Sequence, residues 1–136
     1  MKKTVTSILR CYGKILILKR SDKVRYHQGL WEGVAGHVEK DDAVDERAIM
    51  EIEEETGLKR EQLRMIKRGE PFAVRDKNIG TEFLVHPYLF DVETNKVTID
   101  WEHTEYVWIV PQDIYDYQFV PDLDRTLRAV GIEVRP

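Results

Sequence analysis

The stretch GHVEKDDAVDERAIMEIEEETGL, from Gly36 to Leu58, decides how this 136-residue chain folds. A glycine opens it, and Gly57 near its end is typical of a residue that terminates a helix. Between the two glycines lie nine carboxylates: Glu39, Asp41, Asp42, Asp45, Glu46, Glu51, Glu53, Glu54 and Glu55. Asp41 or Asp42 is expected to cap the helix, because a side-chain oxygen there can accept a bond from a free N–H of the first turn.

Glu51, Glu54 and Glu55 share one face of that helix, because they are three and four residues apart. Like charges at this spacing destabilise a helix by about 0.2–0.5 kcal/mol per pair. A divalent metal bound to a phosphate-bearing substrate would remove the repulsion, and carboxylate oxygens suit Mg2+ or Mn2+. Ala48 and Ile52 occupy the neighbouring arc, so the helix is expected to pack on a sheet with that side.

Strands are expected before and after this helix. The β-rich or extended segments are residues 5–9, 15–18, 31–38, 66–76, 81–92 and 106–110, and an amphipathic helix follows at 122–130. Asp76 to Gly80 reads as a hairpin turn. This order implies an α/β fold, with a mixed β-sheet covered by helices on both faces, in one domain over residues 1–136.

Composition narrows the possible partners. A net charge of −4 and a pI near 5.6 argue against bulk binding to nucleic acid, although a metal can supply local positive charge for a nucleotide. The single Cys11 cannot form an internal disulfide. No apolar run approaches membrane-spanning length, and the N-terminus does not read as a secretory signal, so a cytoplasmic protein is expected. A homodimer is possible.

The stretch from Gly36 to Leu58 also resembles the signature of the Nudix hydrolases, G-x5-E-x7-R-E-U-x-E-E-x-G-U, in which U is apolar. Seven of the nine fixed positions match in register. Two positions differ: Asp42 stands where the family has Glu, and Met50 stands where it has Arg.

The resemblance implies a Nudix-type α/β/α sandwich and a metal-dependent pyrophosphohydrolase. Its substrate would be a nucleoside diphosphate linked to another moiety: an NTP, a dinucleoside polyphosphate or a nucleotide sugar. By position, the resemblance makes Glu51, Glu54 and Glu55 ligands of Mg2+ or Mn2+, together with a backbone carbonyl at Ala35 or Gly36. Metals would neutralise the diphosphate oxygens, and one carboxylate, Glu54 or Glu51, would take the proton of the attacking water.

Met50 is the departure that matters, because the family's Arg holds a catalytic Glu by a bidentate pair that Met cannot make. Arg47 lies one turn earlier and on the same side as Glu51, at i−4. Our hypothesis is that Arg47 substitutes as the orienting residue. Otherwise the enzyme is slower, or catalysis has been lost.

Residues outside the signature are candidates for substrate binding. Lys19 and Arg20 end a strand where family members often place a cation facing the phosphates; the alternative is a solvated strand end. Trp31 either packs against the signature loop or lines a base pocket, and His37 either touches phosphate or faces solvent.

The segment Trp101 to Glu105 is expected to be a charged loop before the last strand. Some family members draw a further carboxylate from this loop as base or metal ligand. Glu102 and Glu105 are both candidates for that role, and their alternative is a charged surface.

Two other classes of function stay open. GLWEGVAGHVE resembles a segment of isopentenyl diphosphate isomerase-like members of the same superfamily, but Cys11 is not where those enzymes need a catalytic cysteine. A non-catalytic nucleotide-binding or regulatory module is suggested by Met50, whereas the presence of every ligand carboxylate argues against it.

Overall fold

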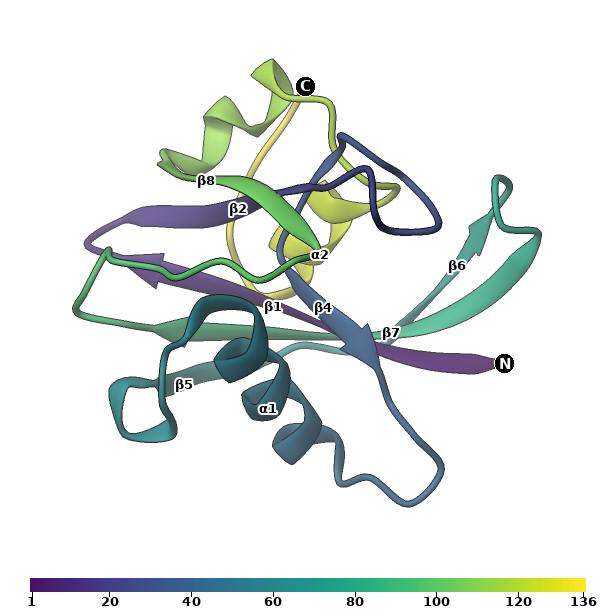
Figure 1. The fold of residues 1–136 in the computed structure, drawn as a ribbon, viewed down its shortest axis with the longest axis horizontal. Helices are drawn as coiled ribbons and strands as arrows, with labels where there is room; N and C mark the ends of the chain where they lie inside the picture. Colours follow the sequence, from purple (N-terminus) through teal and green to yellow (C-terminus); the bar gives the residue numbers. More distant parts are fainter.

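The computed structural model describes residues 1–136, and its centre is a mixed β-sheet (Figure 1). The strands are β1 (Lys2–Cys11), β2 (Lys14–Arg20), β3 (Trp31–Glu32), β4 (Val34–His37), β5 (Arg64–Arg68), β6 (Phe72–Asp76), β7 (Thr81–Asp91) and β8 (His103–Ile109). The helices are α1 (Val44–Thr56), α2 (Leu123–Ala129) and two 3-10 helices, η1 (Arg60–Gln62) and η2 (Pro111–Asp116). No helix in the structure has the length and apolar character needed to cross a bilayer.

The long strands β1 and β7 lie parallel at the middle of the sheet. The other pairings are antiparallel: β1 with β2 and β4, β2 with β3 and β8, and β7 with β5 and β6. Tyr12 and Gly13 both have positive φ, 48° and 84°, as the tight turn between β1 and β2 requires. The hairpin expected at Asp76 to Gly80 is confirmed, because it joins β6 to β7.

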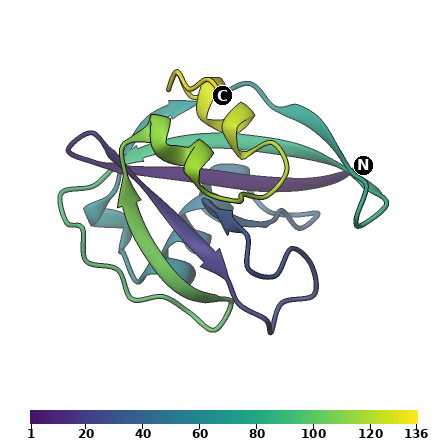
Figure 2. The same ribbon diagram turned by 90° about the horizontal axis from the view of Figure 1, so that it is seen from above.

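Each face of the sheet carries its own apolar core, because successive side chains of a strand point to opposite faces. Along β1, Val5 and Leu9 belong to the core that contains Ala48 and Ile52 of α1. Ile8 belongs to the opposite core, which contains buried apolar side chains of α2. Figures 1 and 2 show α1 on one side of β1 and β7, and α2 with η2 on the other. The expected α/β/α sandwich is confirmed.

The start of α1 differs from the expectation. Ala43 is the N-cap residue and no side chain caps the helix, so the prediction that Asp41 or Asp42 does so is wrong. Asp42 instead accepts hydrogen bonds from the N–H of Glu39 at 2.7 Å and from Arg47 Nε at 2.9 Å. The end of α1 is as predicted: Gly57 has φ 77°, and its N–H donates to the carbonyl of Glu53 at 2.9 Å.

The last strand starts earlier than expected. His103 pairs with Arg20 and Glu105 with Lys19, so the second half of the predicted loop at 101–105 is part of β8. The polar residues of this segment hid the strand, because they pair with the polar end of β2 rather than with apolar neighbours. The β8 and β3 strands pair with opposite edges of β2, and the His103 side chain reaches Glu32 of β3, with Nε2 2.8 Å from Oε2.

Candidate active site

Helix α1 lies directly against strand β4, and the contact is at Gly36. A Cβ placed on Gly36 would lie 2.3 Å from Cδ of Glu51, far inside van der Waals contact. With any other residue at this position, the end of the Glu51 side chain would have to move away from the main chain of β4. This explains the opening glycine of the signature: its missing side chain allows the helix carboxylate to approach the strand.

Arg47 contacts both acidic positions near it. Its Nε donates to Asp42 Oδ2 at 2.9 Å, and its NH1 lies 3.5 Å from Glu51 Oε1. The hydrogen bond from Arg47, with the N–H of Glu39, lowers the pKa of Asp42. Met50 is 47% exposed. The geometry is thus the one that the Arg47 hypothesis requires.

The three helix carboxylates are in different environments. Glu54 is exposed, Glu51 is half-buried and Glu55 is buried. Burial raises the pKa of Glu51, and Glu54 adds to the shift. Burial raises the pKa of Glu55 well above its usual range, and the carboxylates of Glu32 and Glu51 raise it further. No donor lies within hydrogen-bond distance of either Glu55 oxygen, so this face of α1 fits a hard divalent cation.

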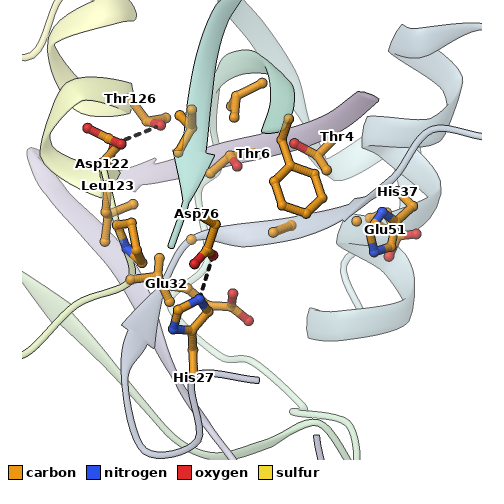
Figure 3. Close-up of a pocket in the computed structure, with 18 of the residues that line it drawn as sticks. Thr4, Thr6, His27, Glu32, His37, Glu51, Asp76, Asp122, Leu123 and Thr126 are labelled. Carbon is orange, nitrogen blue, oxygen red and sulfur yellow. Dashed lines mark hydrogen bonds and ion pairs between the residues drawn. The ribbon is translucent and has the colours of Figure 1, made fainter. Parts of the chain in front are cut away.

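A cavity of about 480 Å³ begins at these carboxylates and extends along the sheet toward α2 (Figure 3). Figure 3 shows Glu51 and His37 at one end, and Asp122, Leu123 and Thr126 at the other. The charged lining includes Arg47, Glu51, Glu54 and Glu102; the apolar lining includes Phe72 and Val74 of β6, Phe83 and Val85 of β7, and Leu123 of α2. Phosphate and apolar groups of one ligand can thus be bound together.

The expected substrate-binding residues are divided by the structure. His37, Ala35 and Gly36 line the cavity. Arg20 also lines it, but its NH1 is bound to both oxygens of Glu32 at 3.0 Å, and its Nε and NH2 donate to the carbonyl of Tyr26.

Lys19 and Trp31 lie outside the cavity lining. Lys19 pairs with Glu105 at 3.4 Å. The Trp31 ring packs edge-on against Tyr117, with centroids 5.3 Å apart, in the core that covers α2. Trp31 is thus a packing residue that lines no base pocket, but it packs in the α2-side core, whereas Val38 and Val44 of the signature belong to the α1-side core.

Of the two candidates Glu102 and Glu105, only the first lines the cavity. Glu102 lines the cavity, and the N–H of Ser21 donates to its carbonyl at 2.7 Å, which holds this segment beside the end of β2. Burial and then Asp100 raise the pKa of Glu102. Glu105 faces Lys19 instead. Only Glu102 is placed to reach a ligand in the cavity.

Two buried residues near α1, His103 and Glu32, were not predicted from the sequence as site residues. His103 and Glu32 bond through Nε2 and Oε2 at 2.8 Å, and His103 Nδ1 lies 2.7 Å from Asp100 Oδ1. Burial lowers the pKa of His103, but its bonds with Glu32 and Asp100 outweigh this and raise it. A further pair, His27 Nε2 and Asp76 Oδ2 at 2.6 Å, lines the cavity (Figure 3). The one sequence feature that could have indicated Glu32 is its place just before the Gly-rich segment. Its partners in the structure are far away in the sequence.

Known proteins resemble this chain over most of its length. A family model described as NUDIX domain matches residues 1–130. The chain is 28% identical to a CTP pyrophosphohydrolase of Escherichia coli K12 over 125 residues, covering 89% of this chain and 84% of that protein. It is also 28% identical to nucleoside triphosphatase NudI of Escherichia coli O139:H28 over 138 residues, covering 94% of this chain and 95% of that protein.

Among solved structures, a Caenorhabditis elegans Ap4A hydrolase has the same fold, with a TM-score of 0.76 at 22% identity, covering 95% of this chain and 94% of that one. The fold and the site define a class of protein: an α/β/α sandwich in which a helix that carries glutamates packs against a glycine of a neighbouring strand. The chain belongs to the Nudix hydrolase family, and it is an enzyme of that family.

Proposed function

We propose that this chain is a divalent-metal-dependent pyrophosphohydrolase that cleaves a diphosphate bond in a nucleoside diphosphate linked to another moiety. The observation that carries the proposal is the single cavity that runs from the α1 carboxylates to an apolar wall built by β6, β7 and α2. Its volume of about 480 Å³ lies within the range of small-molecule sites. A charged end and an apolar end match the phosphates and the base of a nucleotide.

The relatives favour a nucleoside triphosphate among the candidate substrates. Two proteins that match this chain over most of their length are named as a CTP pyrophosphohydrolase and a nucleoside triphosphatase. Dinucleoside polyphosphates and nucleotide sugars stay as alternatives, because an Ap4A hydrolase shares the fold.

Glu51, Glu54 and Glu55 are the residues that would hold Mg2+ or Mn2+, together with a backbone carbonyl at Ala35 or Gly36. The bound metal would neutralise charge on the diphosphate oxygens and make a bound water more acidic. The other contributions come from the chain itself. Arg47 fixes Glu51 through its NH1, and the Gly36 main chain limits where the Glu51 carboxylate can lie.

Proton transfer and binding of the nucleobase are assigned to different parts of the cavity. Glu54 and Glu102 line it, and either can accept the proton of the attacking water. The raised pKa of Glu102 brings this carboxylate closer to the pH at which a general base is effective. At the far end, the rings of Phe72 and Phe83 offer an apolar surface for a base, and Asp122 offers hydrogen-bond acceptors.

The proposal is tested with a panel of nucleoside triphosphates, dinucleoside polyphosphates and nucleotide sugars, incubated with the protein and Mg2+, with every product identified. We expect a nucleoside monophosphate as one product of the preferred substrate. Excess EDTA should abolish hydrolysis, and added Mg2+ or Mn2+ should restore it. Binding without any product would instead identify a non-catalytic module.

Isomerisation of isopentenyl diphosphate is the remaining control in that panel. Cys11 is buried in the core on the α1 side and does not line the cavity, so no isomerisation is expected. Full hydrolysis in excess EDTA, with no metal found by elemental analysis, would contradict the proposed metal dependence.

A further inference from the structure

A buried cluster of three potential metal ligands lies behind the carboxylate face of α1. Glu55 comes from α1, Glu32 from β3 and His103 from β8, and one ligand atom of each lies within 4.8 Å of the others. The three residues are 1%, 5% and 5% exposed, respectively. Only Glu32 reaches the cavity lining, so the cluster adjoins the cavity without being part of it.

Glu55 is the residue that points to a ligand. Both of its carboxylate oxygens are buried, and neither has a hydrogen-bond partner. A carboxylate removed from water without a partner is costly, so buried charges are usually paired or bound to a metal. Its nearest cationic candidate is His103, whose Nε2 lies 3.8 Å from Glu55 Oε1, beyond hydrogen-bond distance.

His103 has the orientation of a metal-binding histidine. Its Nδ1 faces Asp100 Oδ1 at 2.7 Å, and its Nε2 faces the Glu32 and Glu55 carboxylates at 2.8 and 3.8 Å. Histidines that bind metals commonly donate the other ring N–H to a carboxylate, which fixes the ring and its tautomer. Here Asp100 is the carboxylate that faces the other ring nitrogen.

The charges of the cluster are also those of a cation site. Three carboxylates, Glu32, Glu55 and Asp100, surround the imidazole, and one guanidinium, Arg20, lies 3.0 Å from Glu32. With a neutral imidazole, the group carries a net charge of two minus, which one divalent cation neutralises. Arg20 contacts Glu32 through one nitrogen, so each Glu32 oxygen keeps a lone pair that Arg20 does not use, and that of Oε2 faces His103 Nε2.

We propose that Glu32, Glu55 and His103 form a buried binding site for a divalent transition metal such as Mn2+ or Co2+. A nitrogen donor among carboxylates favours such ions over Mg2+, which prefers oxygen ligands only. The inference shares Glu55 with the proposed catalytic metal, but it does not require that the chain hydrolyse nucleotides.

The test is pulsed EPR of Mn2+ bound to the full chain. The protein is produced with 15N-labelled histidine, stripped with a chelator and given one equivalent of Mn2+. We expect the magnetic coupling of a histidine nitrogen to the metal. His103→Gln should remove this coupling and weaken Mn2+ binding about tenfold or more, and Asp100→Asn should weaken it about tenfold while keeping the coupling.

His37→Gln is the matched control, because His37 is exposed, lines the adjoining cavity and should not affect the coupling. Mn2+ bound without nitrogen coupling in the unaltered protein would overturn the proposal, as would coupling that survives His103→Gln. If His103→Gln does not fold, coupling retained in His27→Gln, His37→Gln and His86→Gln still assigns it to His103, since the chain has four histidines.

Hydrolysis of the nucleotide panel with Mg2+ is measured on the same preparations. Hydrolysis without histidine coupling would contradict only the buried transition-metal site. Coupling without hydrolysis of any nucleotide would contradict only the proposed function.

Discussion

Arg47 lies one helical turn before Glu51 and contacts it, whereas Met50, which stands where the family has Arg, cannot form an ion pair. Its guanidinium lies between Asp42 at 2.9 Å and Glu51 at 3.5 Å, and its side chain is largely buried. Met50 is on an exposed part of the helix and has no charged group with which to replace this contact. The hypothesis that Arg47 orients Glu51 rests on this contact.

The first prediction concerns that pair. Arg47→Ala should lower kcat by about tenfold or more, because Glu51 loses the group that orients it. Met50→Arg should change kcat only slightly if Arg47 already holds the glutamate. Steady-state kinetics on the preferred nucleotide measures both. An Arg47→Ala protein with full activity, or a large gain from Met50→Arg, would show that Arg47 does not orient Glu51.

The second prediction separates the cavity face of α1 from its solvent face. Glu54→Gln should lower kcat by about a hundredfold or more, because a metal ligand and candidate base is lost. Glu53→Gln is the matched control: Glu53 pairs with Lys59 at 2.9 Å and does not line the cavity. Equal damage from the two changes would mean that the roles on this helix are assigned wrongly.

At the scale of elements, the site depends on how closely α1 approaches β4. The approach is possible because Gly36 has no side chain where the Glu51 carboxylate lies. Strand β4 is itself held in place by its antiparallel pairing with β1, in which Gly36 pairs with Val5. The position of the Glu51 carboxylate is thus limited by the main chain of a strand that has no side chain at this point.

The third prediction tests this contact. Gly36→Ala would place a Cβ 2.3 Å from Glu51 Cδ, so the glutamate must move, and activity should fall at least about tenfold together with metal affinity. Gly13→Ala is the control, since Gly13 has φ 84° in a turn outside the cavity. It should cost about 1–2 kcal/mol of stability and leave kcat unchanged. Thermal melts and steady-state kinetics of both variants test this prediction. An equal kcat in the two variants would show that the contact does not determine the site.

At the scale of the whole molecule, folding collects carboxylates from distant parts of the chain around one point. Glu32, Glu51 and Glu102 come from a short strand, a helix and a connecting segment, and all three line the cavity. Glu55 is buried beside them. The unfolded chain keeps these groups apart and hydrated, so their mutual repulsion belongs to the folded state only.

The fourth prediction follows from that difference. The pKa values of Glu51 and Glu55 are raised in the folded protein, so the folded state holds these protons more tightly than the unfolded chain does. The metal-free protein should therefore lose stability as pH rises from the ordinary Glu value, about 4.3, through the folded pKa values. Thermal melts across this range in EDTA measure the effect. Glu55→Gln should reduce this pH dependence, whereas Glu53→Gln should not.

Metal and nucleotide should reverse the loss. At neutral pH, Mg2+ with a non-hydrolysable nucleotide should raise the melting temperature more than either alone, because both bind only the folded state. No change in melting temperature with both ligands would contradict binding at this cluster.

Local interactions account for what the sequence by itself determined. The presence of a helix in the signature, its end at Gly57, the shared face of Glu51, Glu54 and Glu55, and the i−4 position of Arg47 all depend on residues within a few positions of one another. Helix geometry relates such neighbours in a fixed way. The amphipathic pattern at 122–130 likewise predicted the final helix, which the structure has as α2.

Only the tertiary structure decided the rest of the site. The bond between His103 and Glu32 joins residues 71 positions apart, and the apolar cavity wall joins β6 and β7 to α2. The tertiary structure also determines that Asp42 accepts a hydrogen bond from Arg47 instead of capping the helix N-terminus. These arrangements depend on the register of β2 with β8 and on the crossing of α1 over β4, which no pattern of neighbouring residues encodes. A buried charge needs a partner, but which partner reaches it is known only once the strands are paired.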